Sequence, residues 1–295
     1  MTEPVDKVIA RIARRQRGYV TRRQLLALGL DRQTVDYRLK LGRLIPVYAG
    51  VYAVGHVPTL PGDRAKGALL ACGRDAVLSH GSAASLWRIR KEWKMPFEVT
   101  AATARRRVGI RVHRCALTRR DVTIQLGLRV TSPARTLIDN APRLREKQLA
   151  RAVNDLRGAG YLRLLDLAEL LERCPRHPGA RRLKPFVLRP HGPTRSEFED
   201  TFLEFARRFG LPRPKVNTRV NGAEVDAFFP NEGLIVELDG YDFHSSRASF
   251  ESDHDRDADM LLAGLPTVRI TWERLIGRPA PEADRLNRIL AARRR

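Results

Sequence analysis

The first fifty residues alternate apolar and polar positions, at first with a helical period and then with a strand period. Apolar residues recur three and four positions apart near the start, and Thr21 and Gln24 have the spacing of a capping box that opens a second helix. Asp31 can cap a third helix, and short apolar runs at 44–47 and 50–54 predict two strands around a turn. This order of elements predicts a winged helix-turn-helix domain over residues 1–56.

Residues 57–190 have the pattern of a mixed α/β unit. Two helices and then two strands are predicted, at 65–72, 79–86, 97–100 and 110–113. Residues 131–133 open a helical stretch that runs to about Cys174. Prolines and glycines become frequent after it, which predicts a linker and a domain boundary near residue 190.

The remaining residues, 191–295, predict a further α/β domain. Its first helix carries phenylalanines at helical spacing from Phe198 to Phe209. Asn221 and Gly222 stand between apolar runs, a signal typical of a tight hairpin. Strands are predicted at 216–220, 223–230, 234–240 and 267–271, with helices at 250–262 and 281–295.

The net charge differs strongly between the two parts of the chain. The 295 residues have a formal net charge of +22, but residues 194–295 hold 16 Lys and Arg against 18 Asp and Glu, a net of −2. Residues 1–193 therefore hold the whole excess, +24. Such asymmetry points to a polyanion partner, with nucleic acid first. The alternative is that arginine serves here as a general solubilising residue.

Cysteine usage and hydropathy limit the cellular setting. Cys72, Cys115 and Cys174 lie far apart and form no CxxC pair, so we expect no disulfide framework and a reducing compartment. No apolar segment is long enough to span a bilayer, so we expect a soluble, cytoplasmic protein without a membrane partner. His80 and His113 have no partners at metal-ligand spacing, and we interpret them as structural.

The third helix is the recognition helix in this interpretation, because in winged helix-turn-helix domains it enters the major groove. Arginine and lysine can hold phosphates, and glutamine and arginine can read base edges. The alternative is a small helical domain with an ordinary charged face. The residues expected to contact double-stranded DNA are Arg32, Gln33, Tyr37, Arg38, Lys40 and Arg43.

Two short apolar runs in residues 223–240 each predict a strand with carboxylates at one end. Ten residues separate Asp226 from Glu237, and a hairpin of that size can bring both, with Asp239, to one edge of a sheet. Clustered carboxylates repel one another, so such a site usually needs a cation such as Mg²⁺ or Mn²⁺. In a strongly basic chain this chemistry suggests phosphodiester hydrolysis. The alternative is that these acids cap strands and turns.

The order helix, three strands, helix, strand, with acids on the middle strands, is the core order of the PD-(D/E)xK nucleases. The sequence resembles the Vsr-like (very-short-patch-repair endonuclease-like) branch of that superfamily over about residues 194–277. The resemblance implies a restriction-endonuclease-like α/β domain that cuts DNA. The residues that carry it are 194–197, 224–226, 236–240, His244, 253–257 and 269–272.

The resemblance also implies a metal site. Asp226 and Glu237 would be ligands of Mg²⁺ or Mn²⁺, and Glu197 on the first helix would hold a metal-bound water or approach the metal. Asp239 occupies the position of the superfamily's lysine. Vsr-like proteins also lack this lysine, which leaves the identity of the catalytic base open.

Three further residues complete the set that the resemblance implies. His244 would act as a general base or acid near neutral pH. Arg256 would stabilise the charge of the transition state, and Asp253 would orient His244 or Arg256.

The N-terminal region resembles a different family. Residues 18–21 and 44–52 are similar to the winged-helix domain of AbiEi-type antitoxins from type IV toxin–antitoxin systems. Residues 78–84 and 130–137 extend this similarity to about residue 145. The resemblance implies DNA binding, often at the protein's own operator. A cognate toxin and a homodimer stay open as partners.

The whole chain is thus expected to be an α/β multi-domain protein that binds DNA and carries a metal-dependent endonuclease domain. The alternative is a non-enzymatic, AbiEi-like antitoxin or transcriptional repressor, in which a degenerate nuclease fold serves dimerisation or binding. A third hypothesis is an RNA-processing factor.

Overall fold

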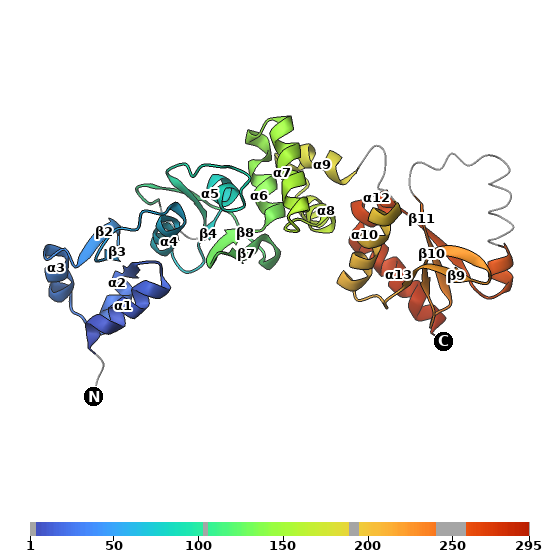
Figure 1. Cartoon of the computed structure of the whole chain (residues 1–295), viewed down its shortest axis with the longest axis horizontal. Coiled ribbons are helices and arrows are strands. Elements are labelled where there is room, and N and C mark those ends of the chain that lie inside the picture. Colours follow the sequence, from blue (N-terminus) through green and yellow to red (C-terminus); the bar gives the residue numbers. More distant parts are fainter. Residues whose placement is uncertain (1–3, 103–105, 189–194, 240–257, 295) are drawn as a thin grey trace. The chain divides into compact units, whose positions relative to one another are not determined.

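The computed structural model describes residues 4–102, 106–188, 195–239 and 258–294 (Figure 1). The chain divides into two compact units, residues 1–158 and residues 159–295. The first unit contains a three-stranded and a five-stranded sheet, and the second contains a four-stranded sheet. In the described ranges, every helix is too short or too polar to cross a membrane.

The N-terminal part of the first unit is a winged helix-turn-helix, as the sequence predicts. Its three strands form an antiparallel sheet of order β1-β3-β2. Periodicity does not reveal β1, because three residues are too few to show an alternating pattern. The elements in chain order are α1 (Val5–Arg15), β1 (Tyr19–Thr21), α2 (Arg22–Ala27), α3 (Arg32–Lys40), β2 (Leu44–Tyr48) and β3 (Val51–Val54).

Side-chain hydrogen bonds confirm the predicted starts of α2 and α3. Thr21 Oγ1 accepts from the backbone N–H of Gln24 at 3.2 Å, and Gln24 Oε1 accepts from the N–H of Thr21 at 2.9 Å. These two bonds complete the capping box. Asp31 Oδ1 accepts from the N–H of Thr34 at 2.7 Å, so Asp31 caps α3.

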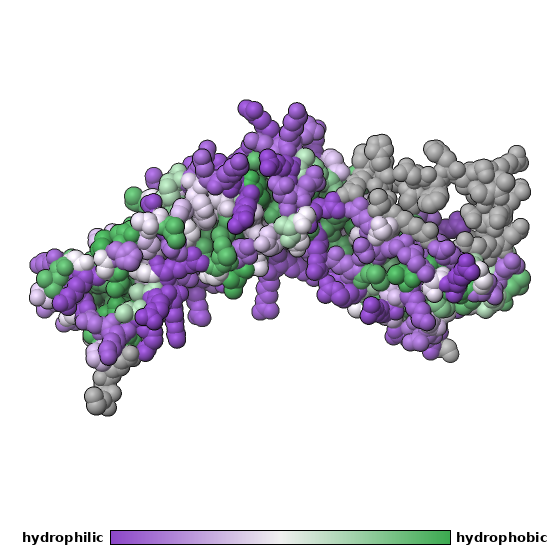
Figure 2. Space-filling view, viewed as in Figure 1, coloured by the Kyte–Doolittle hydropathy of each residue, from purple (hydrophilic) through white to green (hydrophobic). Residues whose placement is uncertain are grey.

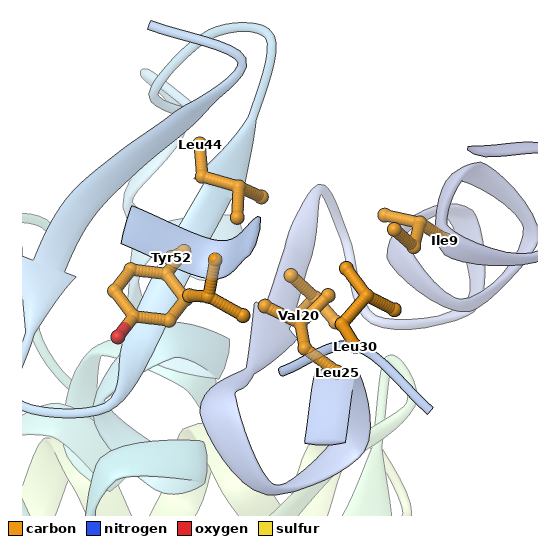
Figure 3. Close-up of a cluster of buried hydrophobic side chains, with 7 residues drawn as sticks. Ile9, Val20, Leu25, Leu30, Leu44 and Tyr52 are labelled. Atoms are coloured by element: carbon orange, nitrogen blue, oxygen red, sulfur yellow. The ribbon is translucent and has the colours of Figure 1, made fainter. Parts of the chain in front are cut away.

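One hydrophobic core lies between these helices and the hairpin (Figure 3). Leu25 and Val35 are fully buried in it. Because Val35 anchors the inner face of α3, the opposite face of that helix is left to solvent. The buried members of this core are Ile9, Val20, Leu25, Leu30, Val35, Leu44 and Tyr52.

The rest of the first unit is the predicted mixed α/β fold. Its sheet has the order β6-β5-β4-β8-β7, with β5 and β6 parallel. Ser79 stands at the N-cap position of α5, but its Oγ lies 3.0 Å from His80 Nδ1 and accepts no backbone N–H of the helix. The elements are α4 (Pro61–Cys72), β4 (Val77–Leu78), α5 (His80–Leu86), β5 (Phe97–Thr100), β6 (Ile110–His113), η1 (Arg119–Asp121), β7 (Val122–Gln125), β8 (Leu128–Thr131), α6 (Pro133–Asn140), η2 (Ala141–Arg143) and α7 (Glu146–Gly158).

The second unit is built on a sheet of order β12-β11-β10-β9, in which only the β11–β12 pair is parallel. Asn221 and Gly222 have φ values of 47° and 83°, which the predicted tight hairpin requires. Residues 258–262 are helical. The named elements are α8 (Leu164–Arg173), α9 (Ala180–Val187), α10 (Arg195–Arg208), β9 (Lys215–Val220), β10 (Ala223–Phe229), β11 (Leu234–Asp239), β12 (Thr267–Thr271), α12 (Trp272–Gly277) and α13 (Pro279–Arg293).

Aromatic packing joins α10 to the sheet and to α12. The ring of Phe198 meets Trp272 edge to face at 5.3 Å, and Phe202 meets Phe229 of β10 at 6.4 Å. Helix α8 belongs to this unit as well, because Arg208 of α10 forms an ion pair with Asp166 at 2.6 Å.

The predicted linker contains a helix. Residues 180–187 form α9 although Pro185 lies inside it. The compact units divide between Gly158 and Ala159, so α8 and α9 fall in the second unit. The domain boundaries near residues 56 and 190 stay predictions.

Candidate functional site

Helix α3 presents a polar outer face. Arg32, Gln33, Tyr37 and Lys40 are exposed, and Tyr37 keeps 61% of its surface accessible. Two cations, an amide and a phenol on one helix can hydrogen-bond to phosphates and to base edges. The exposed Arg43 stands just before β2, at the entry to the wing. Five of the six predicted DNA contacts are thus accessible to a ligand.

Arg38 differs from the other predicted contacts. Its guanidinium forms an ion pair with Asp6 of α1, and its side chain is only 14% exposed. On the same helix, Asp36 lies 3.5 Å from Arg22 of α2. Arg38 therefore joins α3 to α1, and its charge is already matched within the domain.

In the second unit, the carboxylate of Asp226 reaches the strand that carries Glu237 and Asp239. The β10–β11 ladder ends just before Asp226 and Glu237 would pair. Asp226 Oδ2 instead accepts from the backbone N–H of Leu238 at 2.9 Å. The side chain thus takes the place of a backbone acceptor at the point where the two strands part. Asp226 and Glu237 are half-buried, and Asp239 is exposed at the end of β11.

The described residues contain only part of the predicted metal site. Two carboxylates at a strand junction can hold a hard cation whose remaining ligands are water. Among the described residues, however, neither Asp226 nor Glu237 belongs to a group of three metal-ligating side chains within binding distance. His244, Asp253 and Arg256 lie outside the described residues, so their roles stay predictions.

Glu199 is a candidate that the sequence did not single out. It is 8% exposed on α10, and its Oε2 accepts from Asn217 Nδ2 at 2.7 Å. Asn217 lies in β9 at the position that faces Asp226, and its φ of 47° marks an irregular strand there. Glu199 therefore reaches β9, the strand that pairs with the strand of Asp226. The sequence held one signal for it: on a helical wheel Glu199 lies next to Phe198 and Phe202, which predicts that it is buried with them.

Glu197 lies on a different face of α10 from Glu199. Two positions along a helix correspond to a rotation of about 200°. Glu204 shares the face of Glu197, two turns further on, and pairs with Arg163 beside α8 at 3.0 Å. Of Glu197 and Glu199, it is Glu199 that forms a hydrogen bond with a residue of β9.

His80, Glu98 and His113 come together in the first unit. One ligand atom from each lies within 4.8 Å of the other two. The interpretation of the histidines as lacking partners at metal spacing is wrong, because β5 and β6 pair in parallel and bring Glu98 and His113, 15 residues apart, within hydrogen-bond distance. Sequence spacing alone cannot show such a pairing.

Burial and nearby charges set the protonation of this cluster. Burial lowers the pKa of His80 to about 4, so its ring is neutral at pH 7. Burial alone would raise the pKa of Glu98, but the hydrogen bond from His113 and the charge of Arg143 hold it at about 2. The cluster therefore contains an ionised carboxylate and at least one neutral imidazole at pH 7.

A basic pocket of about 550 Å³ lies in the same unit. Its one acid, Asp155, lies 3.4 Å from Arg151. Cations around a hollow favour a phosphate or another anion. Figure 2 shows hydrophilic side chains projecting around α7, which forms one wall. The basic side chains that line this pocket are those of Arg88, Arg90, Lys91, Arg143 and Arg151.

Comparison with known proteins supports the N-terminal assignment. Residues 7–55 match the family described as "Transcriptional regulator, AbiEi antitoxin". Two uncharacterized proteins of Mycobacterium tuberculosis, MT2308 (strain CDC 1551 / Oshkosh) and Rv2248 (strain H37Rv), are each 28% identical over 271 residues. Each alignment covers 88% of this chain and 97% of the relative, so the similarity extends over both units.

Proposed function

We propose that the protein is a DNA-binding transcriptional regulator that places α3 in the major groove of duplex DNA. The observation that carries this proposal is the coincidence of the family match at residues 7–55 with a winged-helix fold whose third helix has a polar outer face. Arg32 and Gln33 lie at the start of α3, the end that contacts base edges in helix-turn-helix proteins. Lys40 and Arg43 would hold phosphates.

Binding to a DNA fragment from the region upstream of its own gene tests this proposal. Gln33→Ala removes one base-reading amide, so we expect binding to weaken by about 1–3 kcal/mol and discrimination at one base pair to relax. Arg14→Ala is the matched control, because Arg14 is exposed on α1, outside the recognition helix. Equal binding by Gln33→Ala and wild type, on target and on scrambled DNA alike, would refute the proposed role of α3.

The antitoxin family supports a cognate toxin as partner. We expect the product of a neighbouring gene to be toxic when expressed alone and harmless when expressed with this protein. Toxicity that persists on co-expression would count against that role and leave the DNA-binding proposal intact.

A metal-dependent endonuclease is the second candidate function, and the contact between Asp226 and Leu238 favours it. A carboxylate fixed at the opening between two strands is placed to hold a cation, with Glu237 as its neighbour and Glu199 near the facing strand. Mg²⁺ or Mn²⁺ would supply an activated water for phosphodiester hydrolysis when bound there. Asp226 and Glu237 would bind the ion, and Glu199 would fix Asn217 beside them.

Plasmid nicking with Mg²⁺ or Mn²⁺ tests this second function. Asp226→Asn is the sharpest variant, because its amide oxygen can still accept from Leu238 while the charge is lost. We expect it to remove cleavage, and Asp200→Asn, at an exposed position of α10, to retain it. If the wild type cleaves no duplex, single-stranded or mismatched DNA, the regulator without enzymatic activity is the better account. Tighter binding to RNA than to duplex DNA would instead favour an RNA-processing factor.

A further inference from the structure

The cluster of His80, Glu98 and His113 is supported by surrounding hydrogen bonds. Ser79 Oγ lies 3.0 Å from His80 Nδ1, and Asn140 Nδ2 donates to the carbonyl oxygen of His80 at 3.0 Å. If Nδ1 of His80 donates its proton to Ser79, the lone pair of Nε2 is free to bind a ligand. Metal-binding histidines are usually oriented in this way, by a partner on the other ring nitrogen.

The backbone and rings of the two histidines are held in an unusual arrangement. His80 has a φ of 48°, in the left-handed region that few residues other than glycine occupy. Strain of this kind clusters at functional sites. The rings of His80 and His113 stack with centroids 3.6 Å apart and planes 12° from parallel. Because the lone pairs of imidazole lie in the plane of the ring, one ring has to turn out of this stack before both rings can bind a single ion.

The set of donor atoms indicates which ion would bind. Two imidazole nitrogens and one carboxylate oxygen are the ligands of zinc in open sites, where a solvent molecule takes the fourth position. Zinc bonds of about 2.0–2.1 Å in a tetrahedron separate the ligand atoms by roughly 3.3 Å. The ligand atoms here lie within 4.8 Å of one another, so rotation of the side chains, including one histidine ring, would close the site.

We propose that His80, Glu98 and His113 form an open zinc site in the first unit. His113 Nε2 lies 2.7 Å from Glu98 Oε2, and the ion would replace the proton that these two atoms share. The side chain of His113 is 20% exposed, which leaves room for solvent and a route for the ion. Arg143 lies 3.3 Å from Glu98 Oε2, where its charge would weaken cation binding but attract an anionic fourth ligand.

Zinc content of the full-length protein, purified without a histidine tag, tests this site. The protein is incubated with Zn²⁺ and freed of excess metal by gel filtration. Its bound zinc is then measured by inductively coupled plasma mass spectrometry. We expect one zinc per chain in the wild type and in His56→Ala, which removes an exposed histidine outside the cluster. We expect His113→Ala to lose the bound zinc.

A second variant keeps the test decisive if His113→Ala misfolds. In Glu98→Gln an amide oxygen can still accept from the N–H of Gly81, the bond that Glu98 Oε1 makes at 3.2 Å. Its zinc affinity should fall by more than the roughly 10- to 100-fold that loss of a supporting residue causes. Co²⁺ in place of zinc should give the visible absorption of a tetrahedral site in the wild type and in His56→Ala, but not in Glu98→Gln. No zinc in the wild type, or equal zinc in the wild type and Glu98→Gln, would overturn the proposal.

Discussion

Leu25 lies in the core of the winged-helix domain and is fully buried (Figure 3). Leu25→Ala removes three carbons from this site. At about 0.8 kcal/mol for each buried methylene, the transfer cost is about 2.4 kcal/mol, and the cavity left behind raises the total to about 3–5 kcal/mol. A small domain has only about 5–15 kcal/mol of stability, so the variant should lose a large part of it.

Native-state hydrogen exchange measured by mass spectrometry can locate this loss. Leu25→Ala should reduce the protection of α1, α2 and α3, while α10 and β10 in the second compact unit keep theirs. Leu26→Ala is the matched control, because Leu26 is the next residue on α2 and is 41% exposed. We expect it to cost less than about 1 kcal/mol. Equal costs for the two variants, or equal losses of protection in both units, would refute the reasoning.

The remaining predictions concern the first unit and are checked by urea unfolding. Thr21→Ala removes half of the capping box and should cost about 1 kcal/mol, whereas an unchanged midpoint would deny the cap a role. Asp139 and Arg135 form a buried ion pair at 3.0 Å. Asp139→Asn breaks this pair and should lower the free energy of unfolding by about 3–5 kcal/mol, whereas joint replacement by Arg135→Met and Asp139→Leu should lower it far less. The Tyr19 hydroxyl is buried and has no hydrogen-bond partner within the described structure, so Tyr19→Phe should be neutral or stabilising, and a cost above about 2 kcal/mol would contradict that. Burial raises the pKa of Tyr19 from 10.0 to about 12, so its protonated form favours the folded state up to pH 10 and this contribution is lost between pH 10 and 12. Over that range wild type should therefore lose more stability than Tyr19→Phe.

Local signals in the sequence predicted many of the elements, but strands β4, β7 and β8 were not predicted. The capping box at Thr21 and Gln24 and the Asn221–Gly222 turn each depend on residues within four positions, and the structure contains both. Periodicity missed β1 because it is short. The helix α9 was hidden by Pro185, which predicts a break where tertiary packing allows a helix.

The candidate sites were harder to predict, because they depend on contacts between distant residues. Glu197 and Glu199 are the same type of residue, and only the structure shows that Glu199 reaches Asn217 of β9. The group of His80, Glu98 and His113 requires the parallel pairing of β5 with β6, which no spacing in the sequence reveals. Arg38 was expected at the DNA, but its pairing with Asp6 depends on how α1 crosses α3.

The central claim, that α3 holds duplex DNA, is tested most directly by the salt dependence of binding. Fluorescence anisotropy gives the affinity for a labelled upstream fragment between about 50 and 200 mM salt. If Lys40 contacts a phosphate, Lys40→Ala should reduce the slope of log affinity against log salt by about 1. Arg14→Ala, with the same loss of charge on α1, should leave the slope unchanged. A slope in Lys40→Ala equal to that of the wild type, or no binding to duplex DNA at all, would contradict the account.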